Sequence, residues 1–163
     1  MSLVAELFSA EDVLLDLDAK DKAGLFEEVA GLFEQRHGIA PDLVVEKLTA
    51  RERIGSTGLG NGVAVPHARI DRLSRAVVSI VRMRSPIPFD APDDKLVSDI
   101  VVFLVPKQST DQCLLILAEI AQMFSDQAFL QRLRACTNAT QVHDVFAGWQ
   151  SKRAPADAIT TRK

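Results

Sequence analysis

The chain has 163 residues, of which 47% are hydrophobic and 25% are charged, and its formal net charge is −3. This length predicts one domain that buries enough surface to fold without a disulfide or a metal. The absence of tyrosine and the single tryptophan argue against an aromatic nucleic-acid platform, and two cysteines are too few for a disulfide scaffold or a zinc site.

The sequence also predicts the compartment. Residues 1–10 mix polar and apolar side chains without a basic start, so no signal peptide is visible. No apolar run approaches the roughly 18 residues of a membrane-spanning helix. Two unpatterned cysteines favour a reducing compartment. We therefore expect a cytoplasmic protein that neither inserts into a membrane nor binds nucleic acid.

The first part of the chain predicts a strand followed by a helix. Residues 1–12 are expected to form a short amphipathic helix or an arm, and the apolar run at 13–17 is typical of a strand. The spacing of apolar residues over 21–36 predicts a helix with one buried face, capped at its start by Asp18 or Asp21.

A glycine and a proline separate this helix from a second one. Gly38 suits a left-handed position just after a helix, because it has no side chain to clash. Pro41 suits the first position of a helix, where a missing N–H costs nothing. The second helix is expected to run to about Arg53, where a glycine-rich stretch begins.

The middle of the chain predicts three strands. Residues 63–65 form a short apolar strand, and residues 76–84 read as a longer one. The three prolines of residues 85–94 predict a loop. Residues 96–105 contain a continuous apolar run, which predicts a central strand covered on both faces.

The last part of the chain predicts three helices. Ser109 with Gln112 matches a capping box ahead of the first, an apolar stripe over 129–133 marks the second, and Asn138 with Gln141 begins the third. Four strands interleaved with helices predict an α/β (α+β) fold, with a small mixed sheet sandwiched between helices in a single domain. Residues 151–163 lack any apolar period and are predicted to be a disordered tail.

The stretch 51–69, RERIGSTGLGNGVAVPHAR, concentrates the features of a functional site. Four of the eight glycines fall within 55–62, and an apolar strand, Pro66 and His67 follow. Residues 51–84 hold seven arginines and two acids, a charge of +5, whereas the remaining twelve basic and twenty acidic residues give −8. A basic patch on an acidic protein predicts a local anionic ligand or an acidic partner face.

Two common kinds of site fit this stretch poorly. His67 has no second histidine or acid at metal-ligand spacing, so we expect no metal and no cofactor. Residues 55–62 lack the lysine of a nucleotide-binding loop and the spacing of a dinucleotide fingerprint, and no helix follows them. What remains is the imidazole as a nucleophile toward a transferable anionic group, with arginines and loop N–H groups stabilising the negative charge. A structural role for a lone histidine is the alternative.

The residues of this stretch carry a family resemblance. The run Arg51-Glu52-Arg53, then GSTGLGNG and VAVPH, is similar to the signature of type 2 enzyme IIA domains of the phosphoenolpyruvate-dependent phosphotransferase system. This is the mannitol, fructose and nitrogen-regulatory group, and the wording STGLGNG most resembles its nitrogen-regulatory branch. The similarity extends over about residues 3 to 149 and includes the later PIPFDAPD and VFLVP segments. It implies an enzyme IIA domain over residues 1–150.

The resemblance also implies roles for individual residues. His67 matches the phosphorylated histidine of the family, and Arg51 matches the arginine that lies beside the phosphoryl group. The residues expected in the loop packed around that group are Ser56, Thr57, Asn61 and Gly62. The arginines expected to form a docking rim for the phosphoryl donor, or else a solvated face, are Arg53, Arg69, Arg72 and Arg75.

Cys113 marks a departure from the family pattern. Many members carry a second active-site histidine early in the helix that follows the Val-Pro turn, and here that position is occupied by Cys113. A thiol then replaces a hydrogen-bond donor and cation. The alternative is that Cys113 is a buried small hydrophobe, as free cysteines often are.

Four functions are weighed on this basis. The first is a phosphoryl-accepting regulatory protein, a phosphotransferase component. A phosphocarrier of the HPr or NPr type is its donor, and a sensor kinase or potassium-transport component is its target. The second is a sugar-specific IIA protein that passes phosphate to a IIB domain. The third is a thiol-dependent hydrolase using Cys113 with His67, and the fourth is a non-catalytic anion-binding module.

Overall fold

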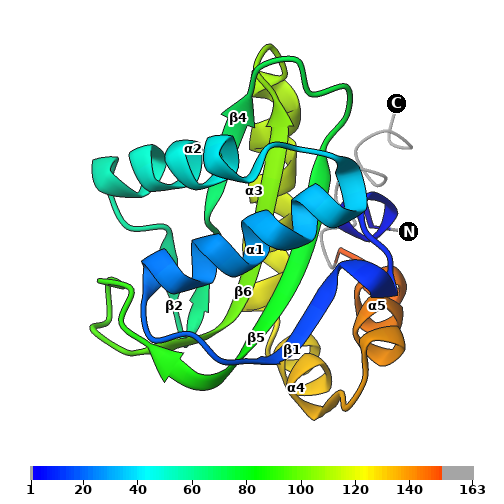
Figure 1. Ribbon diagram of the computed structural model, residues 1–163. Coiled ribbons are helices and arrows are strands. Elements are labelled where there is room, and N and C mark those ends of the chain that lie inside the picture. The colour runs from blue at the N-terminus through cyan, green and yellow to red at the C-terminus, as the bar shows by residue number, and fades with distance from the viewer. Residues whose placement is uncertain (1, 152–163) are drawn as a thin grey trace, which may run out of the picture.

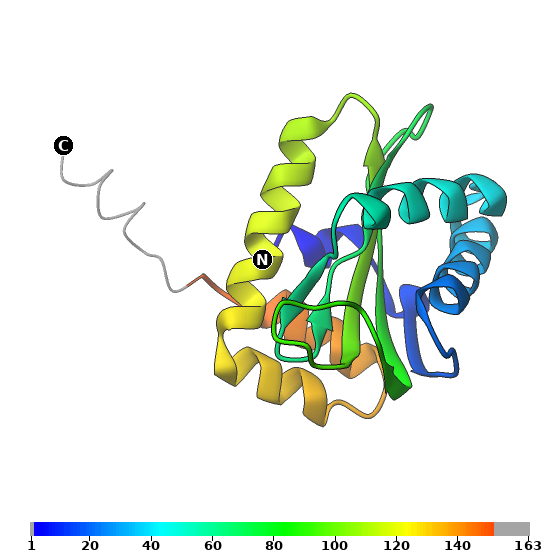
Figure 2. The ribbon, with the colours of Figure 1, turned by 90° about the vertical axis from the view of Figure 1, so that its left-hand side faces the viewer.

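The structure is a computed structural model and describes residues 2–151 (Figure 1). A mixed six-stranded sheet lies between two layers of helices, with α1 and α2 on one face and α3, α4 and α5 on the other (Figure 2). The elements are η1 (Val4–Leu7), η2 (Ala10–Asp12), β1 (Val13–Leu17), α1 (Lys22–His37), α2 (Pro41–Ile54), β2 (Gly58–Gly60), β3 (Val63–Ala64), β4 (His67–Ile70), β5 (Val77–Ile87), β6 (Val97–Pro106), α3 (Thr110–Ser125), α4 (Gln127–Ala135) and α5 (Ala139–Gly148). The predicted α/β sandwich is confirmed.

Strand β6 is the centre of the sheet. It pairs antiparallel with β5 on one side and parallel with both β3 and β4 on the other. Strand β1 extends the sheet beyond β5 in parallel, and β2 extends it beyond β3 as an antiparallel edge. Successive β6 residues alternate between the two cores: Ile100 and Val102 pack under α1 and α2, and Val101 and Phe103 pack against the other helices. The prediction of a strand covered on both faces is confirmed.

The strand boundaries near His67 differ from the sequence prediction. We expected one strand ending at Val65 with His67 just beyond it, but His67 begins strand β4. Pro66 interrupts pairing only locally, because its carbonyl still accepts a hydrogen bond from the Phe103 N–H at 3.2 Å. Both flanking segments keep the same direction along β6, with Val63 opposite Asp99 and His67 opposite Phe103. Pro66 therefore separates β3 from β4, which follow one another along the same side of β6.

Two further elements depart from the prediction. Strand β2 was not expected, because a three-residue edge strand rich in glycine has no apolar alternation. Strand β5 runs on to Ile87, three residues into the segment predicted as loop, because Pro86 lies near its end and the pairing with β6 resumes at Ile87 after an irregularity.

Most helix boundaries follow the predicted signals. The Asp21 carboxylate accepts from the Gly24 N–H at 2.9 Å, Gly38 takes the left-handed conformation after α1, and Pro41 begins α2. Ser109 is the residue before α3, but its side chain makes no capping hydrogen bond, so the predicted capping box is wrong. The predicted disordered tail lies outside the described residues from 152 onward.

The hydropathy of the helices also bears on membrane insertion. Within residues 2–151, no single helix is long and apolar enough to cross a membrane. Helices α3 and α4 reach that length and hydropathy only when taken together, and the chain bends by 85° between them.

Candidate active site

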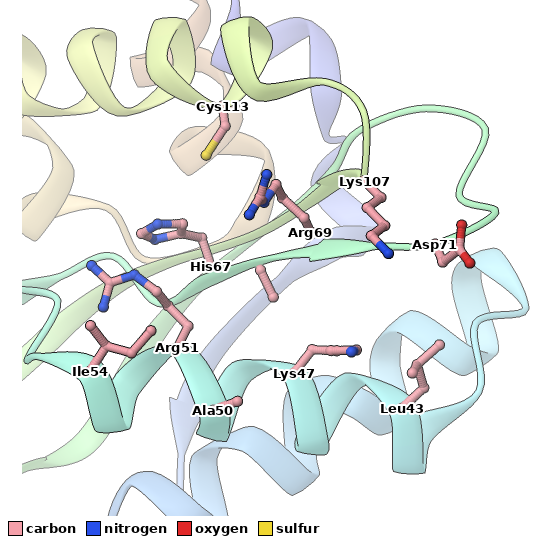
Figure 3. Close-up of a pocket in the computed structure, with 11 residues that line it drawn as sticks. Leu43, Lys47, Ala50, Arg51, Ile54, His67, Arg69, Asp71, Lys107 and Cys113 are labelled. Atoms are coloured by element: carbon pink, nitrogen blue, oxygen red, sulfur yellow. The ribbon is translucent and has the colours of Figure 1, made fainter.

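A cavity of about 670 Å³ opens between α2, the start of β4 and the first turn of α3 (Figure 3). Four cationic side chains and one acidic side chain line it, together with His67 and Cys113. The charged lining residues are Lys47, Arg51, Arg69, Lys107 and Asp71. Such an excess of positive charge around a concave surface attracts an anionic ligand.

His67 is held in one orientation and in one tautomer. Its ring stacks on Phe103 with a centroid distance of 5.0 Å and an interplanar angle of 9°. Its Nδ1 atom lies 2.8 Å from the Val65 carbonyl oxygen. A carbonyl can only accept, so in the neutral ring Nδ1 carries the proton and Nε2 keeps a lone pair. His67 is thus prepared to act as a nucleophile through Nε2.

The surroundings of His67 keep the ring neutral. Burial lowers the pKa of the imidazole below its usual range, and the nearby charge of Arg51 lowers it further. The hydrogen bond to Val65 and the charge of Glu52 raise the pKa, but together they raise it by less than burial and Arg51 lower it. Because the pKa is lowered, the neutral, nucleophilic form persists at pH 7 and below.

This shift predicts the titration of His67. In NMR spectra recorded as a function of pH, the His67 ring should titrate at a lower pH than a histidine in the unfolded chain. The Arg51→Met variant should bring the midpoint back upward, because removal of a nearby positive charge favours protonation. A His67 midpoint above the unfolded value would contradict this description of the site.

Arg51 reaches the cavity from the last turn of α2. Its Nη1 donates to the Gly55 carbonyl at 2.9 Å, a bond that ties the guanidinium to the end of its own helix. A cation in the last turn is also favoured by the helix dipole. Figure 3 shows the guanidinium extending from α2 toward the ring of His67. The remaining N–H donors of Arg51 can therefore face an anion bound at Nε2.

Cys113 joins the same cavity from α3. Its side chain is half-buried and lies above the His67 and Arg69 side chains in Figure 3. Burial raises the pKa of the thiol, and the charges of Arg69 and Arg51 offset only part of that effect. The thiol is therefore protonated at neutral pH, which argues against the hydrolase that uses Cys113 as a nucleophile.

The raised pKa predicts slow thiol chemistry. Alkylation of native Cys113 by iodoacetamide at pH 7 should be slower than that of an unfolded-chain cysteine, because the thiolate is the reactive form. The Cys136→Ser variant removes the other cysteine and makes mass spectrometry of the adduct unambiguous. Alkylation faster than in the unfolded chain would restore the hydrolase hypothesis.

The two hydroxyl residues of the glycine-rich loop point into the protein framework. The Ser56 hydroxyl donates to the Phe89 carbonyl at 2.5 Å and accepts from the Gly58 N–H at 3.0 Å. The Thr57 hydroxyl donates to the buried Glu52 carboxylate at 2.7 Å. Neither Ser56 nor Thr57 lines the cavity, so both act on the shape of the loop.

The other two predicted loop residues lie at a different hollow. Asn61 and Gly62 form the turn between β2 and β3, both with positive φ, and they line a separate hollow of about 380 Å³. The Asn61 carbonyl accepts from Arg134 of α4 at 2.6 Å, and its N–H donates to Asp93. The expectation that they pack around His67 is not met, because the hairpin carries the turn away from the cavity.

The predicted docking arginines separate into two groups. Arg69 follows His67 by two residues on β4, so both side chains leave the same face of the strand and line the cavity. Arg53 is exposed at the end of α2, and Arg72 is exposed in the turn after β4 with a φ of 67°. Neither Arg53 nor Arg72 lines the cavity.

Comparison with known proteins shows the family to which the chain belongs. A model of the family described as the phosphoenolpyruvate-dependent sugar phosphotransferase system, EIIA 2, matches residues 6–148. The chain belongs to this family. The nitrogen regulatory protein of Escherichia coli (strain K12) is 32% identical over 128 residues, which cover 78% of each chain.

Solved structures agree with that assignment. Nitrogen regulatory protein IIA-Ntr from Neisseria meningitidis superposes with a TM-score of 0.84 at 38% identity, covering 89% of this chain and 99% of the other. The enzyme IIA of the Escherichia coli mannitol system, solved in complex with phosphorylated enzyme IIB, shares the fold with a TM-score of 0.72 at 18% identity, over 87% and 98% of the two chains. The chain is therefore similar to nitrogen regulatory IIA proteins within this family.

Three residues at or near the cavity around His67 did not stand out in the sequence. Lys47 lies one helical turn before Arg51, a spacing that already placed it on the same face of α2. Lys107 follows β6, and only the sheet topology brings it to the cavity. Glu52 reads as a surface acid in the sequence but is buried. Within residues 2–151, no group of three or more histidine, cysteine, aspartate or glutamate residues could hold a metal.

Proposed function

We propose that this EIIA 2 protein accepts a phosphoryl group on His67 Nε2 from the phosphohistidine of a small carrier protein of the HPr or NPr type. Its phosphorylation state then controls binding to regulatory proteins in the cytoplasm, such as a sensor kinase or a potassium-transport component. The observation that carries this proposal is the hydrogen bond from His67 Nδ1–H to the Val65 carbonyl, which leaves Nε2 as the nucleophile in a cationic cavity.

The transfer exchanges one P–N bond for another. The Nε2 lone pair attacks phosphorus in line with the donor histidine, the donor P–N bond breaks, and its electron pair returns to the donor imidazole. The Nδ1 proton stays on His67, where the Val65 carbonyl stabilises the positive ring of the phosphohistidine. Because the two P–N bonds are similar in energy, the protein contributes alignment and charge compensation more than bond-making groups.

The cavity supplies that charge compensation. A phosphoryl group adds up to about two negative charges, and the cavity holds four cationic side chains against one acid. Arg51 is best placed to bind the oxygens, since its guanidinium extends toward the His67 ring (Figure 3). Phosphorylation therefore removes part of the excess positive charge of this face, a change that a charged target surface would sense.

The surface around the cavity suits protein docking. Three large apolar side chains near the opening are exposed: Ile54 at the end of α2, and Leu114 with Leu115 beside Cys113. Arg53 and Arg72 are exposed as well, and we propose that they extend the positive surface beyond the cavity. A partner with an apolar contact area and acidic or phosphorylated groups fits this surface.

The experiment is a phosphorylation assay with two carriers. The protein is incubated with phosphoenolpyruvate, enzyme I and either a nitrogen-type or a sugar-type carrier, and uptake is followed by intact-mass spectrometry. We expect one acid-labile phosphoryl group per chain, with faster uptake from the nitrogen-type carrier. Anion binding at the cavity with no covalent phosphate from either carrier would refute the proposal and leave the binding module.

A sugar-specific role is the second candidate. It is favoured by one observation, the shared fold with a mannitol IIA that was solved in complex with phosphorylated IIB. The phosphorylated protein is mixed with purified fructose-type and mannitol-type IIB domains, and loss of phosphate from His67 is measured. Rapid transfer to a IIB domain would favour this candidate over the regulatory one.

A further inference from the structure

His67 is linked by a series of hydrogen bonds to the buried carboxylate of Glu52 in α2. Glu52 follows Arg51 in α2, yet its side chain turns inward and is only 6% exposed. Its carboxylate accepts the Thr57 N–H at 3.0 Å and the Thr57 hydroxyl at 2.7 Å. It also accepts from the Lys22 ammonium at 3.0 Å. A buried acid with four lone-pair sites is here satisfied by a lysine and by both donors of one residue.

Thr57 links Glu52 to the residues that precede His67. Its carbonyl accepts the Val65 N–H at 3.0 Å, which continues the pairing of β2 with β3 by one more residue. The Val65 carbonyl in turn accepts the His67 Nδ1–H at 2.8 Å. Four hydrogen bonds therefore connect these residues in sequence: two join Thr57 to Glu52, one joins Val65 to Thr57, and one joins His67 to Val65.

We propose that Glu52 is a positioning residue for phosphoryl transfer, which holds the imidazole of His67 in its Nδ1–H tautomer through Thr57 and Val65. This inference rests on the proposed function, because it concerns the same attacking nitrogen. The Val65 carbonyl is available to the histidine because β3 ends at Ala64, so this carbonyl lies beyond the strand. Glu52 also anchors the loop that carries Gly55, the acceptor of the Arg51 guanidinium.

The test uses Glu52→Gln. A glutamine has the same length, but its amide oxygen is the single acceptor group and its NH₂ cannot accept from Thr57, so one buried donor is left unpaired. The readout is the pair of ring nitrogen chemical shifts of His67 in ¹⁵N NMR, which distinguish the two neutral tautomers. We expect the wild-type ring to be held as Nδ1–H and the variant to populate both tautomers. Phosphoryl uptake should slow by roughly tenfold or more, as expected when a reacting atom loses its alignment.

Two controls separate positioning from simple loosening of the protein. Lys22→Met removes the ion pair but leaves both bonds from Thr57 to Glu52, so it should lower stability without changing the tautomer of His67. Glu46→Gln makes the same substitution at an exposed position of the same helix and should change neither readout. If Glu52→Gln does not fold, Thr57→Val decides, because it removes the hydroxyl donor alone and should still yield a mixture of tautomers.

The outcomes are distinct. A folded Glu52→Gln protein with a single Nδ1–H tautomer and wild-type uptake overturns the inference, and so does an equal tautomer shift in Lys22→Met. If Glu52→Gln fails to fold, an unchanged Nδ1–H tautomer in Thr57→Val overturns it. The tautomer is measured without any phosphoryl donor. A wild-type protein that takes up no phosphate would therefore refute the proposed function while leaving the positioning result readable.

Discussion

Replacing His67 with alanine should abolish phosphoryl uptake. Among the described residues that line the cavity, only His67 combines a free lone pair, a neutral state at pH 7 and a fixed direction, and alanine removes all three. We expect the rate to fall by on the order of 10³-fold or more, as for the loss of an enzymatic nucleophile. Transfer from the phosphorylated carrier is measured as the mass gain of the intact chain against time.

His143→Gln is the matched histidine control. The His143 ring is part-buried like that of His67, and its Nε2 lies 3.0 Å from the Ala5 carbonyl, but it belongs to α5 and not to the cavity. Glutamine can keep that hydrogen bond, so uptake should remain at the wild-type rate. Thermal unfolding of both variants checks that the fold is kept. Equal uptake by His67→Ala and wild type would mean that the phosphoryl group goes elsewhere.

Replacing Arg51 with methionine should produce the next largest effect. The guanidinium extends toward the His67 ring, and we propose that it binds the phosphoryl oxygens as charge develops during transfer. Loss of one such preorganised donor costs roughly 10²-fold in rate. The phosphohistidine, once formed, should also hydrolyse faster, because its oxygens lose a charged partner. Uptake is followed with the carrier, and the lifetime is followed after the carrier has been removed.

Arg53→Met provides the comparison on the same helix. Arg53 is exposed and does not line the cavity, so the change removes the same charge at nearly the same place in the sequence. It should leave the lifetime of the phosphohistidine unchanged and weaken only carrier docking at low salt. A shorter lifetime in Arg53→Met, equal to that in Arg51→Met, would show that general charge rather than the cavity geometry stabilises the product.

Sequence patterns predicted the parts of the fold that depend on local chemistry. The caps at Asp21, Gly38 and Pro41 each follow from one side chain and its own backbone, and all three occur as expected. The burial of β6 on both faces follows from its continuous apolar run. Strand β2 and the break at Pro66 depend instead on pairing with residues far along the chain, which local propensity does not encode.

The same distinction applies to the candidate site, where the sequence indicated some residues and only the fold determines the position of others. His67 stood out through its residue type and surroundings, and Arg51 through the family resemblance, and the fold places both at one cavity. Asn61 and Gly62 are near His67 in sequence, but the hairpin carries them to another hollow. Cys113 reaches the cavity only because α3 starts above β4. The sequence of a loop does not show which way the loop turns. Long-range hydrogen bonds determine that, such as the one that Arg134 donates to the Asn61 carbonyl.

The identity of the phosphorylated atom tests the proposed function most directly. The protein is phosphorylated with phosphoenolpyruvate, enzyme I and the carrier, and ¹H–³¹P correlation NMR then assigns the phosphoryl group to a ring nitrogen. Because Nδ1 donates to the Val65 carbonyl, we predict one phosphoryl group on Nε2 of His67. Phosphate on Nδ1 of His67, on any other residue, or on none would contradict it.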